Sequence, residues 1–162
     1  MLTEKLKKYN IILGSASPRR KELLKGIGLN FSIKITDKEE SYPTDLKDVQ
    51  IVEFLAKQKQ EFLSKELKSN DLLITADTIV SQKGEVLHKP KDKNDAKNIL
   101  FNLSGNSHRV ITGICIKTLE KEVTFSTITT VHFNKLSETE IEYYINKFKP
   151  FDKAGSYGIQ EW

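Results

Sequence analysis

The sequence has very little of what disulfide-stapled and zinc-binding proteins need. Cys115 is the only cysteine among 162 residues, so an intrachain disulfide cannot form. It lies in the apolar run Val110–Ile116, where we expect a small buried thiol. The three histidines, His88, His108 and His132, are far apart and lack the spacing of zinc ligands. These absences leave open only a metal that is held by oxygen ligands.

Long hydrophobic runs are also missing. The segment Met1–Asn10 is charged and has no apolar core, so we expect no signal peptide. No apolar run approaches the roughly 20 residues that a membrane span requires, which predicts a cytoplasmic protein without a membrane partner. No repeat, low-complexity segment or Pro/Gly-rich linker divides the chain, and 162 residues suit one domain with a real core.

Dense basic segments are absent although the chain is basic. The formal net charge is +4 and the pI is about 9.0, but the lysines are spread along the whole chain. No block of Lys/Arg with interleaved aromatic residues occurs, so we expect no nucleic-acid partner. Local groups of Arg and Lys suit a small polyphosphate equally well.

What is present is an alternation of strand and helix patterns. The hydrophobic spacing predicts five strands, over Ile11–Leu13, Asn30–Thr36, Asp71–Val80, Arg109–Thr118 and Glu122–Phe133. It also predicts four helices: from Pro18 to near Gly26, over Asp48–Lys68, over Asn94–Leu103, and from the capping box at Ser137 through Lys147. Because the two kinds of element alternate, the fold class is α/β with a mixed sheet.

The segment Gly14–Arg20 is the first candidate for a binding site. It follows the apolar run Ile11–Leu13 and opens a helix, with Ser17 in a suitable N-cap position and Pro18 as the first helical residue. Free backbone N–H groups at a helix start attract anions, and two arginines and two hydroxyls stand beside them. The alternative is an ordinary Ser-Pro helix start with solvated arginines. We expect a phosphate-binding corner here.

Further candidates carry charge on or after predicted strands. Asp77 ends the apolar run 72–76, where a carboxylate can line a ligand crevice or simply cap a turn. Glu39 and its neighbour Glu40 follow the second strand and can supply oxygen to Mg²⁺ or Mn²⁺, or belong to an acidic surface loop. Lys59 and Lys89 would be read as solvated if taken alone.

Six motifs in one order make the chain similar to a known family. They are Ser15-Ala-Ser-Pro-Arg-Arg-Lys-Glu-Leu-Leu24, Leu55-Ala-Lys-Gln-Lys59, Ala76-Asp-Thr78, Lys89-Pro90, Gly105-Asn-Ser-His-Arg-Val-Ile-Thr-Gly113 and Asp152-Lys-Ala-Gly-Ser-Tyr-Gly-Ile-Gln160. From about Tyr9 to its last residue, the sequence resembles the Maf-like nucleoside triphosphate pyrophosphatases, a family originally linked to inhibition of septum formation.

The resemblance implies a fold and a reaction. The fold would be related to the inosine-triphosphate pyrophosphatases, with an elongated mixed β-sheet, flanking helices and a central cleft. The reaction would convert a nucleoside triphosphate to its monophosphate and pyrophosphate with a divalent cation, Mg²⁺ or Mn²⁺. The nucleotide is then the expected partner, and a homodimer stays open.

The resemblance also assigns roles to residues at matching positions. Asp77 matches the proton acceptor and would also contact the metal. The positions around the phosphates and the metal are matched by Ser15, Arg19, Glu39, Lys59 and Lys89, with Glu39 as our choice of metal ligand. Substrate choice is linked to Arg19, Thr78 and Gln160, and the Arg, Thr and Gln found here belong to the branch that acts on dTTP and UTP, not on 7-methyl-GTP.

One departure and one rival function accompany this interpretation. Family members continue for roughly 30 residues beyond the Gln160 loop, so we expect residues 1–162 to form a single Maf-like domain without that last segment. The rival is a nucleotide-binding regulatory module in cell division that does not turn its nucleotide over. Release of pyrophosphate would distinguish the two functions.

Overall fold

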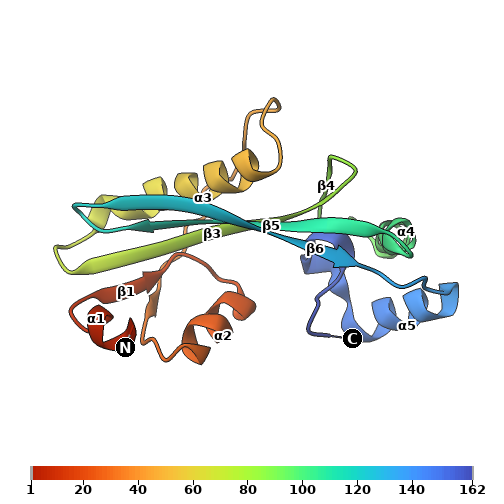
Figure 1. Ribbon diagram of the computed structural model, residues 1–162, viewed down its shortest axis with the longest axis horizontal. Helices are drawn as coiled ribbons and strands as arrows, with labels where there is room; N and C mark the ends of the chain where they lie inside the picture. Colours follow the sequence, from red (N-terminus) through yellow and green to blue (C-terminus); the bar gives the residue numbers. More distant parts are fainter. Residues whose placement is uncertain (1, 162) are drawn as a thin grey trace. The chain divides into compact units, whose positions relative to one another are not determined.

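The computed structural model describes residues 2–161 and shows a six-stranded sheet flanked by helices (Figure 1). The helices are α1 (Leu2–Leu6), α2 (Pro18–Gly26), α3 (Val49–Leu63), α4 (Lys93–Leu103) and α5 (Glu138–Phe148). The strands are β1 (Asn10–Leu13), β2 (Ser32–Ile33), β3 (Asp71–Gln82), β4 (Glu85–Leu87), β5 (Ser107–Lys117) and β6 (Glu122–His132). In the part of the chain that the structure describes, no helix is long and apolar enough to cross a bilayer.

The strand order is β2-β1-β3-β5-β6, with β4 beside β3. Strand β1 runs parallel to β2 and to β3, and its register places Leu13 opposite Ile74. Strands β3 and β4 are antiparallel and are joined through the turn at Lys83 and Gly84. The sheet is therefore mixed, which confirms the α/β class expected from the sequence.

The chain divides into two compact units. The first contains residues 1–77 and 112–126, and the second contains residues 78–111 and 127–162. The long strands β3, β5 and β6 each contribute residues to both units. The boundary within β3 falls between Asp77 and Thr78.

In the first unit, β3 carries apolar side chains to both of its faces, because successive residues of a strand point in opposite directions. Leu72 belongs to a core cluster with Ile11 and Leu29, against which Leu24 of α2 packs. Thr75 faces α3, where its Oγ1 donates a hydrogen bond to the Ala56 carbonyl at 2.7 Å. Figure 1 shows α2 and α3 on opposite sides of β3.

Helix α3 lies unusually close to β5 in this unit. A Cβ atom at Gly113 would lie 2.4 Å from both the carbonyl carbon and the carbonyl oxygen of Val52. Only a residue without a side chain allows this approach. Gly113 and the Thr75–Ala56 hydrogen bond therefore fix α3 on the sheet, and with it the side chains that α3 carries.

The second unit has a separate core between α4 and α5. Ala96 and Leu100 of α4 pack against Ile141, Tyr144 and Ile145 of α5. The start of α5 is fixed by the predicted capping box, in which the Ser137 and Glu140 side chains each bond the other residue's backbone N–H.

Several boundaries differ from the sequence prediction. Strand β2 covers only Ser32–Ile33, because its partner β1 ends at Leu13, the residue paired with Ile33. Helix α3 ends at Leu63 and continues as a single 3₁₀ turn over Ser64–Glu66. Helix α1 and strand β4 were not predicted, since both are too short to show a clear hydrophobic period.

Candidate active site

The segment between β1 and α2 begins where β1 leaves β3. The Gly14 N–H donates to the Ile74 carbonyl at 2.8 Å, and the chain then turns at Ser15. A Cβ at Gly14 would lie 2.6 Å from Thr75 Cγ2, so the tight passage of the chain requires glycine. The nine-residue helix α2 follows with Pro18 in its first turn. The N-terminus of α2, whose first N–H groups have no partner within the helix, thus follows this turn directly, as in an anion-binding corner.

Ser17 stands at the N-cap position, but its side chain makes no capping hydrogen bond. The hydroxyl that acts in this segment is that of the buried Ser15, whose Oγ accepts the Ser17 N–H at 3.3 Å. The predicted helix start is thus confirmed, whereas side-chain capping by Ser17 is wrong. Ser15 organises the turn instead.

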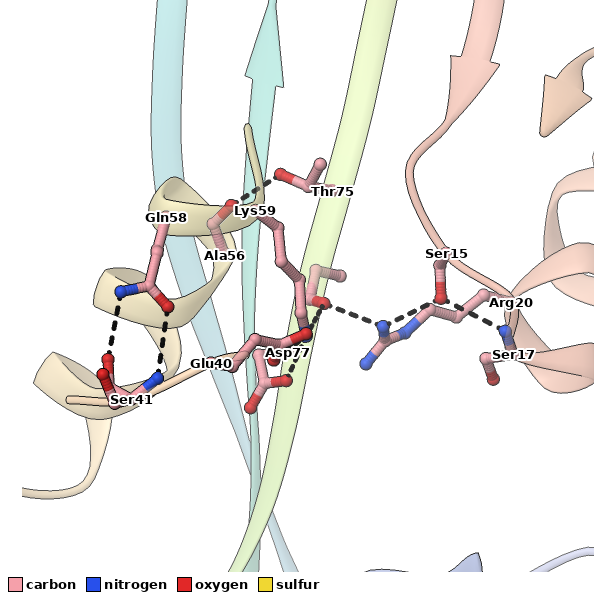
Figure 2. A network of polar contacts seen from close by, with 11 residues as sticks. Ser15, Ser17, Arg20, Glu40, Ser41, Ala56, Gln58, Lys59, Thr75 and Asp77 are labelled. Carbon is pink, nitrogen blue, oxygen red and sulfur yellow. Dashed lines mark hydrogen bonds and ion pairs between the residues drawn. The ribbon is translucent and has the colours of Figure 1, made fainter. Parts of the chain in front are cut away.

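The two arginines of the motif differ in their surroundings. Arg19 is exposed, while Arg20 turns inward and its Nη1 donates to Ser15 Oγ at 3.1 Å and to the Ala76 carbonyl at 2.8 Å (Figure 2). Burial lowers the pKa of the Arg20 guanidinium, and the nearby Asp77 carboxylate acts in the opposite direction. Arg20 keeps its charge at neutral pH because an arginine is not deprotonated in proteins. The interpretation of both arginines as solvated is wrong for Arg20.

Asp77 lies within β3, which continues to Gln82 and does not end at the carboxylate as the apolar run suggested. It continues because the β-forming residues Thr78, Ile79 and Val80 extend the strand. Asp77 Oδ1 accepts a hydrogen bond from Lys59 Nζ at 2.5 Å, and the side chains of Asp77 and Lys59 are 17% and 12% exposed. Asp77 is therefore no turn cap but a half-buried carboxylate beside a cation.

The Lys59 ammonium occupies the centre of this group. Besides Asp77, it pairs with Glu40 Oε2 at 2.9 Å and donates to the Ala76 carbonyl at 3.2 Å. Its three N–H donors thus have three oxygen partners on two different segments (Figure 2). The loop that carries Glu40 is tied to α3 as well, because Gln58 Nε2 donates to the Ser41 carbonyl at 3.1 Å.

Glu39, the predicted metal ligand, is exposed, and its neighbour Glu40 makes the contact with Lys59. The structure brings Glu40, not Glu39, to Lys59 and Asp77. Among residues 2–161, no three His, Cys, Asp or Glu side chains gather as a metal cluster. Two carboxylates do flank one cation, however, and Mg²⁺ is commonly held by one or two carboxylates together with substrate phosphates. The donor set fits that ion.

The remaining predicted residues belong to the second unit. Thr78 follows Asp77 in β3, and Lys89 is exposed between β4 and α4. The segment of Lys89 is held next to the glycine loop, because the Gly155 N–H donates to the His88 carbonyl at 3.3 Å. Gln160 is exposed in a short turn that closes with a hydrogen bond from the Glu161 N–H to the Gly158 carbonyl at 3.0 Å.

The Gln160 turn is anchored by Tyr144 of α5. The Tyr144 hydroxyl accepts the Gly158 N–H at 2.9 Å and donates to Glu161 Oε2 at 2.5 Å. Lys153 adds an ion pair with Glu161 at 3.0 Å. The predicted residue Gln160 is therefore presented from a turn that is fixed at both of its ends.

Sequence reasoning did not single out Arg20 from Arg19 or Glu40 from Glu39, and only Arg20 left a signal that could have done so. On a helix, residues i and i+4 share a face, and Arg20 shares its face with Leu24, which packs against the core. That spacing predicts an inward Arg20. Glu39 and Glu40 lie in an irregular segment, where no period distinguishes one from the other.

Comparisons with known proteins agree with this architecture. The Ham1 protein of Staphylococcus aureus covers 76% of this chain and 71% of its own, with a TM-score of 0.50 and 11% identity. A nucleoside-triphosphatase / dITP/XTP pyrophosphatase of Mycobacterium abscessus covers 76% of this chain and 73% of its own, with a TM-score of 0.50 and 12% identity. At such low identity these two structures show the fold alone.

Sequence relatives show more. The dTTP/UTP pyrophosphatase of Flavobacterium johnsoniae is 48% identical over 162 residues, which are 100% of this chain and 84% of that protein. The dTTP/UTP pyrophosphatase of Phocaeicola vulgatus is also 48% identical, over 99% of this chain and 84% of its own length. The family model for Maf-like proteins matches residues 10–162. By these matches, the chain belongs to the Maf family.

Proposed function

We propose that this protein is a nucleoside triphosphate pyrophosphatase that hydrolyses dTTP and UTP to the monophosphate and pyrophosphate. The observation that carries the proposal is the junction of Ser15, Arg20, Ala76, Asp77 and Lys59, where a helix N-terminus and a half-buried carboxylate are tied to each other. Relatives at 48% identity are named for this activity. A nucleotide substrate and the lack of a spanning helix among residues 2–161 are compatible with the expected cytoplasmic location.

The reaction needs a water molecule to attack the α-phosphorus of the nucleotide. The water oxygen forms a bond to phosphorus, the bond from phosphorus to the α–β bridging oxygen breaks, and pyrophosphate leaves with the electron pair. Asp77 is the proposed general base that takes the proton from the water. Its half-buried carboxylate lies beside Lys59 and has the oxygen acceptor that this step needs.

The substrate brings about four negative charges, which cationic groups must balance. The exposed Arg19 and the N-terminus of α2 are the proposed phosphate contacts of the first unit, supported by Ser15. Lys59 stands beside Asp77 and is the proposed cation for the phosphate nearest the base. Lys89 keeps the role that its family motif gives it, as a further phosphate contact.

A divalent cation, Mg²⁺ or Mn²⁺, would be held by Asp77 and Glu40, the two carboxylates that flank Lys59. Glu40 takes the role that was predicted for Glu39. When bound, the metal supplies charge neutralisation on the phosphates and a lower pKa for a bound water. Lys59 keeps the two carboxylates together through its contacts with both.

Selection of the base is proposed to depend on Arg19, Thr78 and Gln160, as in the dTTP/UTP branch of the family. The fixed ends of the Gln160 turn support this role, because a side chain that reads a base must be held in place.

A pyrophosphate-release assay tests the proposal, with dTTP, UTP and 7-methyl-GTP as substrates and with Mg²⁺, Mn²⁺ or EDTA present. We expect pyrophosphate from dTTP and UTP only with the divalent ion. Orthophosphate as product, or preference for 7-methyl-GTP, would overturn the assignment. Nucleotide affinity without any product would point to a binding module.

A further inference from the structure

The second arginine of the opening motif links two segments of the first unit. The Arg20 Nη1 atom lies 2.8 Å from the Ala76 carbonyl oxygen and 3.1 Å from Ser15 Oγ. Ser15 stands in the turn that leads to the N-terminus of α2, and Ala76 directly precedes Asp77 in β3. One guanidinium nitrogen thus bridges the anion-binding corner and the strand that carries the carboxylate (Figure 2).

The Arg20 bridge matters because it lies just beyond the point where the pairing between β1 and β3 ends. Strands β1 and β3 pair from Asn10 to Leu13, and the Gly14 N–H to the Ile74 carbonyl is the next backbone hydrogen bond. Within residues 2–161, no backbone hydrogen bond joins the two segments beyond that point. Arg20 therefore links the two segments directly beyond the end of the pairing between β1 and β3.

The bridge is also stronger than a neutral contact. Hydrogen bonds from a charged donor are shorter and stronger than those between neutral groups. The Ser15 oxygen at one end is fixed a second time by the Ser17 N–H, and the Ala76 carbonyl at the other end also accepts from Lys59. Loss of Arg20 would therefore loosen the corner against Asp77 while leaving each segment attached to its own neighbours.

We propose that Arg20 is a positioning residue, which holds the phosphate-binding corner of Ser15 at the correct distance from Asp77. The inference rests on the proposed function and extends it to a residue that the family motif did not assign. In this proposal Arg19 contacts the phosphates of the nucleotide, whereas Arg20 holds in place the segment to which these phosphates bind.

A positioning role predicts a particular kinetic signature. A reactant displaced by about 1 Å can cost about 10²-fold in rate although it still binds. The Arg20→Gln variant should therefore lower kcat by about 10- to 100-fold while KM for dTTP changes by less than about threefold. Arg19→Ala, the matched change one residue earlier, should act mainly on KM.

The test combines kinetics with a measurement that does not depend on activity. We would measure kcat and KM of wild type, Arg20→Gln, Arg20→Lys and Arg19→Ala, and follow the Ser17 amide by hydrogen exchange in the unliganded protein. Arg20→Gln should speed exchange at Ser17 by about tenfold or more, because the Ser15 oxygen that accepts this N–H loses its anchor. Arg20→Lys keeps a cationic donor and should fall between Arg20→Gln and wild type in both measurements. It also serves as the test variant if Arg20→Gln does not fold.

Each possible result either supports or overturns the positioning role of Arg20. A rise in KM at constant kcat in both Arg20 variants would make Arg20 a direct phosphate ligand and overturn the proposal. Folded Arg20 variants with wild-type kcat and wild-type Ser17 exchange would overturn it as well. If the wild type released no pyrophosphate, the proposed function would fail, but the Ser17 exchange would still report whether Arg20 anchors the corner.

Discussion

The two units of this chain stabilise their polar groups in opposite ways. In the first unit, the charged side chains of Arg20, Lys59 and Asp77 meet at main-chain and hydroxyl oxygens. In the second unit, Glu161 is charged and bonds to Lys153 and Tyr144, but the buried polar contact around His108 is neutral and aromatic. His108 Nε2 lies 2.7 Å from the Tyr157 hydroxyl, and both rings pack edge-on against Phe133.

This difference suits the charged groups of the first unit to catalysis and the neutral groups of the second unit to stabilising the fold. Charges that are held together and only half buried are available to a charged substrate, as the first unit requires. Neutral groups inside a core stabilise the fold and bind no phosphate. Substitutions of Arg20, Lys59 or Asp77 in the first unit should therefore act on turnover, and substitutions of the neutral network in the second unit should act on stability.

The strongest test of that division uses two aspartates of the same strand. Asp77→Asn keeps the size of the side chain but removes the proposed base, so turnover should fall by about 10²- to 10⁴-fold while the fold survives. Asp71, also in β3, is buried and accepts hydrogen bonds from Asn10 Nδ2 and from the Lys68 N–H. Asp71→Asn should therefore lower the melting temperature and leave kcat nearly unchanged. Near-normal turnover in folded Asp77→Asn would show that this carboxylate is structural.

A second test breaks the support of the first unit without touching its charges. In Gly113→Ala, the new Cβ would collide with the Val52 backbone, which cannot rotate away as a side chain can. We expect a loss of about 3 kcal/mol or more in the free energy of unfolding, at the upper end for overpacking. Gly26→Ala is the matched control, because no atom lies within 4 Å of its Cβ. Equal melting temperatures of the two variants would mean that α3 can move away from β5.

The neutral network of the second unit should make stability depend on pH at both extremes. Burial raises the pKa of Tyr157 to about 12, and the pKa of Tyr144 is raised by burial and by Glu161. The unfolded chain releases its phenolic protons near pH 10, so stability is present below that value and is lost as the pH rises toward 12.

At the acidic extreme the sign reverses. Burial, and to a smaller degree His132, lowers the pKa of His108, so the unfolded chain takes up a proton near pH 6.5 before the folded chain does. Stability should therefore fall again below about pH 6.5. Urea unfolding at several pH values measures both effects, and Tyr157→Phe should remove part of the alkaline loss. The same alkaline slope in that variant would assign the loss to other groups.

The smallest expected effect concerns one polar side chain of the first unit. Gln60 of α3 is fully buried, and neither its Nε2 nor its Oε1 has a hydrogen-bond partner. Gln60→Leu should stabilise the protein by about 1–2 kcal/mol, because an unsatisfied buried polar group carries a desolvation cost. Gln58→Leu on the same helix is the control and should give no gain, since Gln58 bonds to the Ser41 backbone. A lower melting temperature for Gln60→Leu would mean that this amide is satisfied, for instance by a buried water.

Much of the fold could be predicted because its signals are local. The capping box of Ser137 and Glu140 defined the start of α5, and the glycine, serine and proline after Leu13 defined the start of α2. Strand β2 was overestimated because alternation along a sequence does not show where the neighbouring strand ends.

The site was predictable as a set of motifs but not atom by atom. Two adjacent arginines and two adjacent glutamates were candidates, and in each pair the structure places the second residue in the polar network around Asp77. Which residue of a pair points inward depends on packing against distant segments, which a local pattern does not contain. The roles assigned to all of the site residues, those of Asp77 and Arg19 included, stay predictions.

The oxygen that Arg20 and Lys59 share belongs to the main chain of Ala76. In genetic terms, a codon change at position 76 alters the side chain but cannot delete the acceptor, since every amino acid brings the same carbonyl. Mutations can remove this link only through its donors. Drift at position 76 is then limited by the space around Ala76, which is 6% exposed, while heritable loss of the link has to arise at positions 20 and 59.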